Sequence, residues 1–269
     1  MSDVGSVSAL WRYPVKSMRG EACTKVDVGG RGIAGDRAYA LVDAQSGKIA
    51  SAKNPRLWPD LLSYGARYLE PPDAVGRAAR VEVAFPSGTK MQSDDAALAR
   101  MLSVELGRPV RFSASAPVDP VLDEYWPDME DLAHRDTVTE EATRSQTFFD
   151  AASVHLVTQR TLEALHALAP EASFSVARFR PNIVVEAPDD DADFPEDAWV
   201  GRSLHIGDVV LNITQQTGRC VMTTLAQQGL PNDGNVLRTA ARNHSAYVGV
   251  YAEVVRGGTV RVGERLILA

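Results

Sequence analysis

The amino-acid sequence predicts a β-rich α+β fold with β-barrel architecture and a few short helices. Short apolar runs separated by turn residues recur along the whole chain, and many of them alternate apolar and polar residues as half-buried strands do. Only about three segments have helical periodicity, and strands do not alternate with helices as they would in a parallel α/β sheet. Many short strands at close spacing are typical of β-barrels.

Strands dominate the first part of the chain. Five stretches predict strands, and the two that contain a Ser-Gly turn predict hairpins: residues 7–15, 22–30, 36–51, 80–93 and 109–114. The first strand should end at Pro14, because proline has no backbone N–H for the ladder. Residues 93–109 predict the helix of this part, with Ser93 as its N-cap and Gly107 and Pro109 at its end.

An acidic, proline-containing and weakly periodic stretch, residues 113–150, separates the two parts of the chain. We therefore predict one domain over residues 1–115 and a second over residues 116–269. Five stretches of the second domain predict strands: residues 153–158, 182–187, 199–214, 246–255 and 259–269. Two stretches predict helices, the first of them capped by its initial threonine: residues 158–170 and 235–243.

The composition is that of an ordinary globular protein, with 45% hydrophobic and 23% charged residues. No run approaches the roughly 18 apolar residues of a membrane span, and the N-terminus lacks the pattern of a signal peptide. Cys23 and Cys220 are too few for a disulfide framework, and no local feature supports a bond between them. We therefore expect a reduced, cytoplasmic protein that binds no membrane.

The net charge of −7 argues against general nucleic-acid binding. The charge is unevenly distributed, however. Residues 1–60 contain nine Lys or Arg and six Asp or Glu, whereas residues 119–150 contain ten acidic residues and two arginines. The acidic run is typical of a solvated loop. The basic N-terminal part instead indicates a binding site for an anionic ligand.

One glycine pattern imitates a nucleotide-binding motif. Gly30-x-Gly32-x-x-Gly35 has the spacing of the dinucleotide fingerprint, in which the third glycine must open a helix. The residues that follow alternate like a strand, and no βαβ unit is predicted. We interpret the glycines as a tight connection between strands that places Arg37 at the start of a strand.

Other catalytic signatures are missing from the sequence, which contains no Gly-x-Ser-x-Gly, no His-Glu-x-x-His and no P-loop. The histidines have no metal-ligand spacing, which favours surface or core roles over zinc binding: His134, His155, His166, His205 and His244. The chemistry of this protein must therefore come from other residue types.

Cationic and polar residues at turns are the remaining candidates. They lie in YPVKSMRG, GDRAY, ARFRPN and TGRC: Lys16, Ser17, Arg19, Arg37, Arg178, Arg180, Asn182, Arg219 and Cys220. Any one of these short motifs is more often structural. Together they indicate one pocket, with cations for a phosphate and a thiolate for a soft metal. The alternative is that Cys220 is a buried and chemically inert cysteine.

The ordered set YPVKSMRGE, GDRAYALVD, FRPNIVVE, EDAW to IGDVVL, and RCVMTT resembles the MOSC proteins. This family includes amidoxime-reducing proteins and the C-terminal domain of molybdenum cofactor sulfurase. The resemblance covers nearly the whole chain. It implies that the first hundred or so residues are a MOSC N-terminal β-barrel domain and that the rest is a MOSC domain with a mixed β-barrel.

The resemblance also implies a cofactor, molybdenum–molybdopterin, and the residues that bind it. It implies no dependence on pyridoxal phosphate. Cys220 stands where the amidoxime-reducing members have the cysteine that ligates molybdenum. The other implied contacts match the family's motifs, the last of them in a looser context: Lys16, Ser17, Arg37, Arg180, Asn182, Arg219 and Thr158. We further expect Arg219 to lower the pKa of the neighbouring Cys220 thiol and so to favour the thiolate that a metal needs.

By this resemblance the chain is a molybdenum-containing reductase of N-hydroxylated small molecules. It has no cysteines left for an iron–sulfur cluster and no flavin or nicotinamide motif, so its electrons should come from a separate ferredoxin, cytochrome or flavin reductase. Amidoxime-reducing members commonly continue Thr-Thr-x-Asp-Pro, whereas this chain has TTLAQQ, which leaves the substrate open. The rival interpretation is a cofactor carrier or a sulfur-transfer protein in which Cys220 holds a persulfide.

Overall fold

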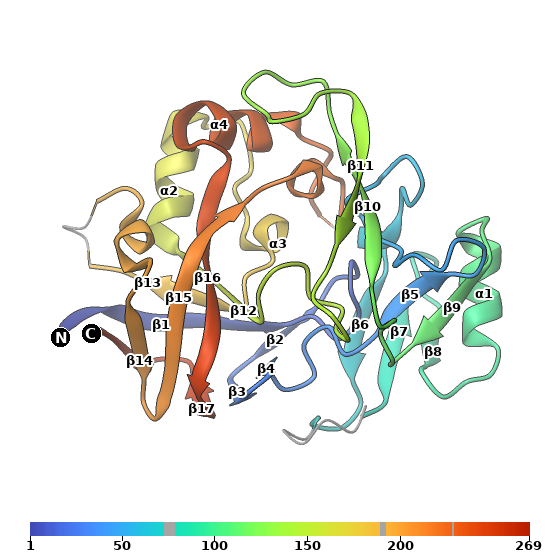
Figure 1. Cartoon of the computed structure of the whole chain (residues 1–269), viewed down its shortest axis with the longest axis horizontal. Coiled ribbons are helices and arrows are strands. Elements are labelled where there is room, and N and C mark those ends of the chain that lie inside the picture. The colour runs from blue at the N-terminus through green and yellow to red at the C-terminus, as the bar shows by residue number, and fades with distance from the viewer. Residues whose placement is uncertain (73–78, 189–191, 228) are drawn as a thin grey trace.

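The computed structural model describes residues 1–72, 79–188, 192–227 and 229–269. Seven strands form a closed, mixed barrel (Figure 1), in which each strand pairs with the next and the last pairs with the first: β13 (Ile183–Glu186), β12 (Val154–Thr158), β16 (Tyr247–Arg256), β15 (Val209–Gly218), β14 (Ser203–Ile206), β18 (Arg265–Leu268) and β1 (Ser2–Arg12). Strands β12 and β13 are parallel, and the other pairs in the ring are antiparallel. The predicted β-rich α+β fold with barrel architecture is confirmed.

Strand β1 closes the barrel although it comes from the first residues of the chain. It pairs with β18 on one side and with β13 on the other, and a bulge between Asp3 and Gly5 lets it bend. A Cβ at Gly5, where φ is +125°, would stand 2.1 Å from the Glu186 carbonyl oxygen, so only glycine fits this approach. The N-terminal strand therefore belongs physically to the second half of the molecule, and the domain boundary near residue 115 stays a prediction.

Smaller sheets cover one side of the barrel (Figure 1). They are built from the following strands: β3 (Lys25–Gly29), β4 (Gly32–Ile33) and β17 (Gly258–Arg261); β5 (Ala40–Asp43) and β9 (Val110–Ser113); β6 (Gly65–Tyr68), β7 (Val81–Ala84) and β8 (Lys90–Gln92). Strand β2 (Glu21–Cys23) instead extends the sheet of the barrel by pairing with β1. The β3–β4–β17 sheet packs onto the core of the barrel. A second apolar core lies between the β5–β9 pair, the β6–β7–β8 sheet and α1 (Leu98–Glu105), and it also takes in Val221 and Leu225, which follow Cys220. This shared core fixes the cysteine loop against the N-terminal sheets.

Four α-helices lie within the described ranges: α1, α2 (Gln159–Leu168), α3 (Val176–Phe179) and α4 (Gly234–His244). The predicted N-cap of α2 is confirmed, since the Thr158 hydroxyl accepts from the Thr161 N–H. The predicted N-cap of α1 was wrong. The Ser93 hydroxyl instead accepts from the Val81 N–H at 3.1 Å and ends the β7–β8 hairpin, so the helix starts only at Leu98. Helix α3 has four residues, too few for a periodic signal.

The acidic stretch contains a hairpin for which the sequence predicts no element. Strands β10 (Val121–Trp126) and β11 (Thr137–Ala142) pair from Val121↔Ala142 to Trp126↔Thr137 and stand beside the barrel (Figure 1). Most side chains of β11 are exposed, so the apolar alternation that marks a half-buried strand is missing. Of the predicted pair over residues 36–51, only β5 is a strand, with one further bridge between Val42 and Ile49.

The glycine pattern forms no nucleotide-binding helix. Gly32 lies in β4, and the chain then turns over residues 34–37. Arg37 lies in this turn with φ of 47°, three residues before β5, so the expectation that it starts a strand was wrong. Cys23 and Cys220 are both free thiols. In the ranges given above, no helix has the length and apolar character needed to cross a membrane.

Candidate functional site

A cavity of about 360 Å³ lies between the outer face of β12, β15 and β16, the turns that follow β1 and β4, and the β10–β11 hairpin. Seven of the predicted site residues line it, together with residues that the sequence did not indicate: Lys16, Ser17, Arg37, Arg178, Arg180, Arg219 and Cys220, with Lys53, Glu124, Trp126, Glu141, Asp150, His155 and Tyr251 among the others. The loops that bring them together are up to two hundred residues apart in the chain. Thr158 and Asn182 do not line the cavity.

Three of the lining residues adopt the left-handed backbone conformation. Ser17, Arg37 and Arg180 have φ values of 61°, 47° and 54°, which residues with a Cβ rarely take. Arg180 uses this conformation to end α3 as its C-cap. Such strain persists only where the surrounding structure imposes it, and it gathers at binding sites. The backbone at these turns therefore aims side chains into the cavity.

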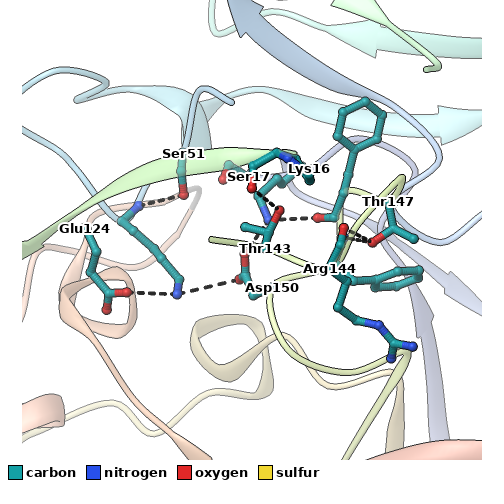
Figure 2. Close-up of polar contacts among 12 residues, drawn as sticks. Lys16, Ser17, Ser51, Glu124, Thr143, Arg144, Thr147 and Asp150 are labelled. Carbon is teal, nitrogen blue, oxygen red and sulfur yellow. Dashed lines mark hydrogen bonds and ion pairs between the residues drawn. The ribbon is translucent and has the colours of Figure 1, made fainter. Parts of the chain in front are cut away.

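Lys16 is buried and its ammonium is already paired (Figure 2). It donates to the Phe148 carbonyl oxygen at 2.8 Å and forms an ion pair with Asp150. Burial lowers the pKa of Lys16, and the Asp150 carboxylate opposes this effect. Ser17 supports the turn, since its hydroxyl accepts from the Ala52 N–H at 3.1 Å. Lys16 thus presents a charge that is held in place by Asp150.

Two arginines lie against the ring of Tyr13. The guanidinium carbon of Arg37 lies 4.8 Å from the ring centroid, and that of Arg180 lies 4.2 Å from it. Arg37 also pairs with the buried carboxylate of Asp36. The Arg180 guanidinium has no hydrogen-bond acceptor in the part of the chain that the structure describes, although the residue is only 6% exposed, and burial lowers its pKa to about 10. A buried cation with free donors fits a phosphate.

The Arg219 guanidinium bonds to other groups of the protein. It donates to the Val248 carbonyl oxygen at 2.9 Å and to that of Phe179 at 3.1 Å, and it contacts the His155 ring. The predicted lowering of the pKa of the Cys220 thiol was wrong, because burial outweighs the charges around it, although Arg219 and Cys220 do interact electrostatically. Burial raises the pKa of Cys220 to about 12 and outweighs the opposing charge of Lys53. A metal that binds here must therefore displace the thiol proton.

The two threonines after Cys220 shape its loop. The Thr223 hydroxyl donates to the Cys220 carbonyl oxygen at 3.0 Å, and the Thr224 hydroxyl donates to that of Val221 at 2.8 Å, which closes the 3₁₀ turn η3 (Val221–Thr224). Arg178, which is 1% exposed, clamps this turn by donating to the carbonyl oxygens of Thr223, Leu225 and Pro231 at 3.2, 3.2 and 2.7 Å. Residue 228 of the following TTLAQQ segment lies outside the described residues.

Thr158 and Asn182 lie behind the cavity and bond to protein groups. The Thr158 hydroxyl donates to the buried Glu196 carboxylate at 2.7 Å. The Asn182 amide accepts from the His155 N–H at 3.1 Å and donates to the Trp11 carbonyl oxygen at 3.3 Å, so it ties β1 and β12 together. Their role as cofactor contacts stays a prediction.

Sequence reasoning missed the residues that complete the cavity. Lys53 donates to the Glu124 carboxylate at 3.0 Å, and its ammonium lies 3.9 Å from Asp150 (Figure 2). His155 is buried, and both burial and the Arg219 charge lower its pKa far below the usual value, so it is neutral. Had VLDEYW been interpreted as a strand, its alternation would have placed Asp123 and Glu124 on opposite faces.

The described residues contain no group of three or more His, Cys, Asp or Glu that could hold a metal ion. A metal at Cys220 would therefore take its other ligands from a bound organic group. The cavity offers one thiol and several cations. Among the described residues, Arg180 and Lys53 keep N–H groups that no protein group accepts. That donor set fits a soft metal carried by an anionic cofactor.

Comparison with known proteins places the chain in one family. Residues 4–74 match the MOSC N-terminal beta barrel domain, and residues 143–267 match the MOSC domain. The chain belongs to the MOSC proteins, with both domains in the order the motifs predict.

Two curated relatives match along nearly the whole length of this chain. Mitochondrial amidoxime-reducing component 1 of Mus musculus is 25% identical over 305 residues, which cover 100% of this chain and 83% of the relative. Mitochondrial amidoxime reducing component 2 of Rattus norvegicus is 25% identical over 294 residues, which cover 98% and 83%. The YuaD protein from Bacillus subtilis is a similar solved structure, with 12% identity, 98% and 94% coverage and a TM-score of 0.49. The chain is thus a distant relative of the amidoxime-reducing components.

Proposed function

We propose that this protein is a molybdenum-cofactor-dependent oxidoreductase that reduces N-hydroxylated small molecules. The observation that carries the proposal is the cavity itself, where the half-buried Cys220 thiol and the unpaired Arg180 guanidinium face the same space. The distant relation to amidoxime-reducing components supports the reaction class.

The chain's own residues would divide the binding of this cofactor between them. The Cys220 sulfur would ligate molybdenum after losing its proton. Arg180, with Arg37 and Lys16 nearby, would bind the cofactor's phosphate, because guanidinium groups match phosphate oxygens in a fork. Bound in this way, molybdenum on its dithiolene would supply two-electron redox chemistry at the cavity, and the protein would supply orientation and charge.

The proposed reaction balances with two electrons and two protons. An amidoxime, R–C(=N–OH)NH₂, takes up two electrons and two protons, its N–O bond breaks, and R–C(=NH)NH₂ and water leave. We propose that a separate ferredoxin, cytochrome or flavin reductase supplies the electrons, that no nucleic acid or membrane takes part, and that the protein works in the cytoplasm.

Metal and pterin analysis tests the proposal. Wild type purified from a cofactor-producing host should contain about one molybdenum per chain and reduce benzamidoxime with a chemical electron donor. Cys220→Ser should lose the metal and the activity. Cys23→Ser is the matched control, because Cys23 is the chain's other free thiol and lies outside the cavity. Loaded wild type that reduces no N-hydroxylated compound would refute the reductase.

The carrier or sulfur-transfer role of Cys220 is the second candidate. A persulfide forms through attack by a thiolate, and the raised pKa of Cys220 disfavours that species at neutral pH. Cofactor content without any turnover of N-hydroxylated substrates would favour the carrier over the reductase.

A further inference from the structure

One wall of the cavity carries a charge pair that the family's motifs do not include. Glu124 lies on β10, its side chain is 8% exposed, and the 18% exposed side chain of Lys53 donates to it at 3.0 Å (Figure 2). Both residues line the same cavity as Cys220. The pair therefore faces the proposed reaction centre from the hairpin side.

Both members of the pair keep hydrogen-bonding capacity. The Lys53 ammonium has three N–H groups, and Glu124 takes one of them. The second oxygen of Glu124, Oε1, has no hydrogen-bond partner among the residues that the structure describes. Although burial lowers it, the pKa of Lys53 is held well above its usual value chiefly by the Asp150 carboxylate, with Glu124 adding to the effect, so the ammonium stays charged. A donor and a charged acceptor thus stand side by side.

We propose that Lys53 and Glu124 are the substrate-binding pair and select substrates in which an N–H group neighbours the N–O group. Glu124 would accept a hydrogen bond from the amino group, while Lys53 would donate to the hydroxyl oxygen. Amidoximes, N-hydroxyguanidines and N-hydroxylated amino-nucleobases have this arrangement, whereas compounds without the N–H group do not. This inference rests on the proposed reductase function.

Lys53 would act on the oxygen that leaves. When the N–O bond breaks, two electrons from the partner protein and two protons from solvent convert the N–OH group to N–H and water, with one proton going to the oxygen and the other to the nitrogen. Negative charge grows on that oxygen as the bond lengthens, and a fixed ammonium stabilises it. Lys53 keeps its own proton throughout, so it is a donor of hydrogen bonds and not an acid.

A matched control pair lies one residue away. Asp123 precedes Glu124 on β10 and therefore points to the opposite face of the strand. It accepts from Lys48 at 2.7 Å, just as Glu124 accepts from Lys53. Neither Asp123 nor Lys48 lines the cavity of Cys220. Changes in this control pair report structural damage to the hairpin without touching substrate.

Steady-state kinetics on cofactor-loaded protein tests the pair. The substrates are benzamidoxime and its N,N-dimethyl analogue, which lacks the amino N–H. Glu124→Gln should raise KM for benzamidoxime roughly tenfold, since a charged acceptor is lost, and leave KM for the analogue unchanged. Lys53→Met should lower kcat for both substrates roughly hundredfold. Lys48→Met and Asp123→Asn should change neither constant, with equal molybdenum content in all variants.

The assignment of Lys53 and Glu124 to substrate binding would be overturned by either of two results. One is an equal change in KM for both substrates in Glu124→Gln, and the other is an equal change in KM in Glu124→Gln and Asp123→Asn. If Glu124→Gln does not fold or load, Glu124→Asp replaces it and should also raise KM for benzamidoxime alone, because its shorter side chain keeps the charge but no longer reaches the amino group. Calorimetric binding of benzamidoxime to loaded protein without an electron donor separates this inference from the proposed function. Wild type that binds but does not turn over refutes the reductase, while weaker binding in Glu124→Gln alone still supports the pair.

Discussion

The two walls of the cavity use the same residue types in different ways. On the motif wall, built by the loops around Cys220 and Arg180, Arg178 and Arg219 donate mainly to backbone carbonyl oxygens and hold loops in place. On the hairpin wall, Lys53 pairs with the Glu124 carboxylate and keeps donors free. A cation that satisfies carbonyls is part of the framework, whereas one with free donors is available to a ligand.

The difference is sharpest between two arginines two positions apart. Arg178 is fully buried and donates to three carbonyl oxygens of the Cys220 loop. Arg180 is nearly as buried, yet its guanidinium lies on the Tyr13 ring and lines the cavity. Sequence proximity therefore does not assign their roles; their hydrogen-bond partners do.

The largest expected effect concerns the reactivity of Cys220. In cofactor-free protein, burial raises the pKa of this thiol to about 12, so its thiolate fraction rises tenfold per pH unit through pH 8 to 11. In a Cys23→Ser background, alkylation by iodoacetamide at pH 8 should be at least about a hundredfold slower than that of a free thiol, which has a pKa near 8.5. A rate that levels off near pH 9 would show that burial does not control this thiol.

Removing the framework arginine should cost most stability. Arg178→Met removes the donor to the buried carbonyl oxygens of Thr223 and Leu225 and to the part-buried one of Pro231, and each buried group left unsatisfied costs about 1–3 kcal/mol. We expect a loss of about 3 kcal/mol or more in the free energy of unfolding, measured by urea denaturation. Arg180→Met, the matched substitution, should cost far less, because its guanidinium satisfies no acceptor in the described chain. Equal losses in the free energy of unfolding would show that both arginines stabilise the fold to the same extent, contrary to this prediction.

The free arginine should instead control cofactor content. Arg180→Lys keeps the charge but loses the fork that matches a phosphate, so pterin retained after gel filtration should fall roughly tenfold. Arg19→Lys serves as the control, because it makes the same exchange at an arginine that does not line the cavity. Pterin content that is unchanged in Arg180→Lys would place the phosphate elsewhere in the cavity.

Much of this distinction lay beyond sequence reasoning. The motifs placed Lys16, Arg37, Arg180 and Cys220 in one pocket, because short polar motifs at turns survive as recognisable patterns. They could not show that Arg219 donates to the carbonyl oxygens of Val248 and Phe179. An arginine that binds a ligand and one that binds backbone carbonyls look the same in a sequence, because only the fold determines their partners. The barrel was predictable from strand spacing, whereas its closure by β1 depends on a pairing across 180 residues.

The hairpin wall was missed for a different physical reason. Strand β11 is mostly exposed, so burial imposes no apolar alternation on it, and its charges resemble those of a solvated loop. Glu124 and Asp150 form part of the site because each pairs with a lysine, Lys53 and Lys16 respectively. These lysines lie about 70 and 130 residues earlier in the chain. Long-range ion pairs leave no local signal in one sequence.

The smallest expected effect tests the ring that holds the arginines. Tyr13→Phe removes only the hydroxyl that donates to the Pro181 carbonyl oxygen at 3.1 Å, which should cost about 1 kcal/mol of stability. Pterin content should stay at the wild-type level, because Arg37 and Arg180 still have an aromatic face to lie on. Tyr13→Leu removes that face and should lower pterin content. If both variants retained pterin equally, the ring would be a spacer in the motif wall and not a support for its free cation.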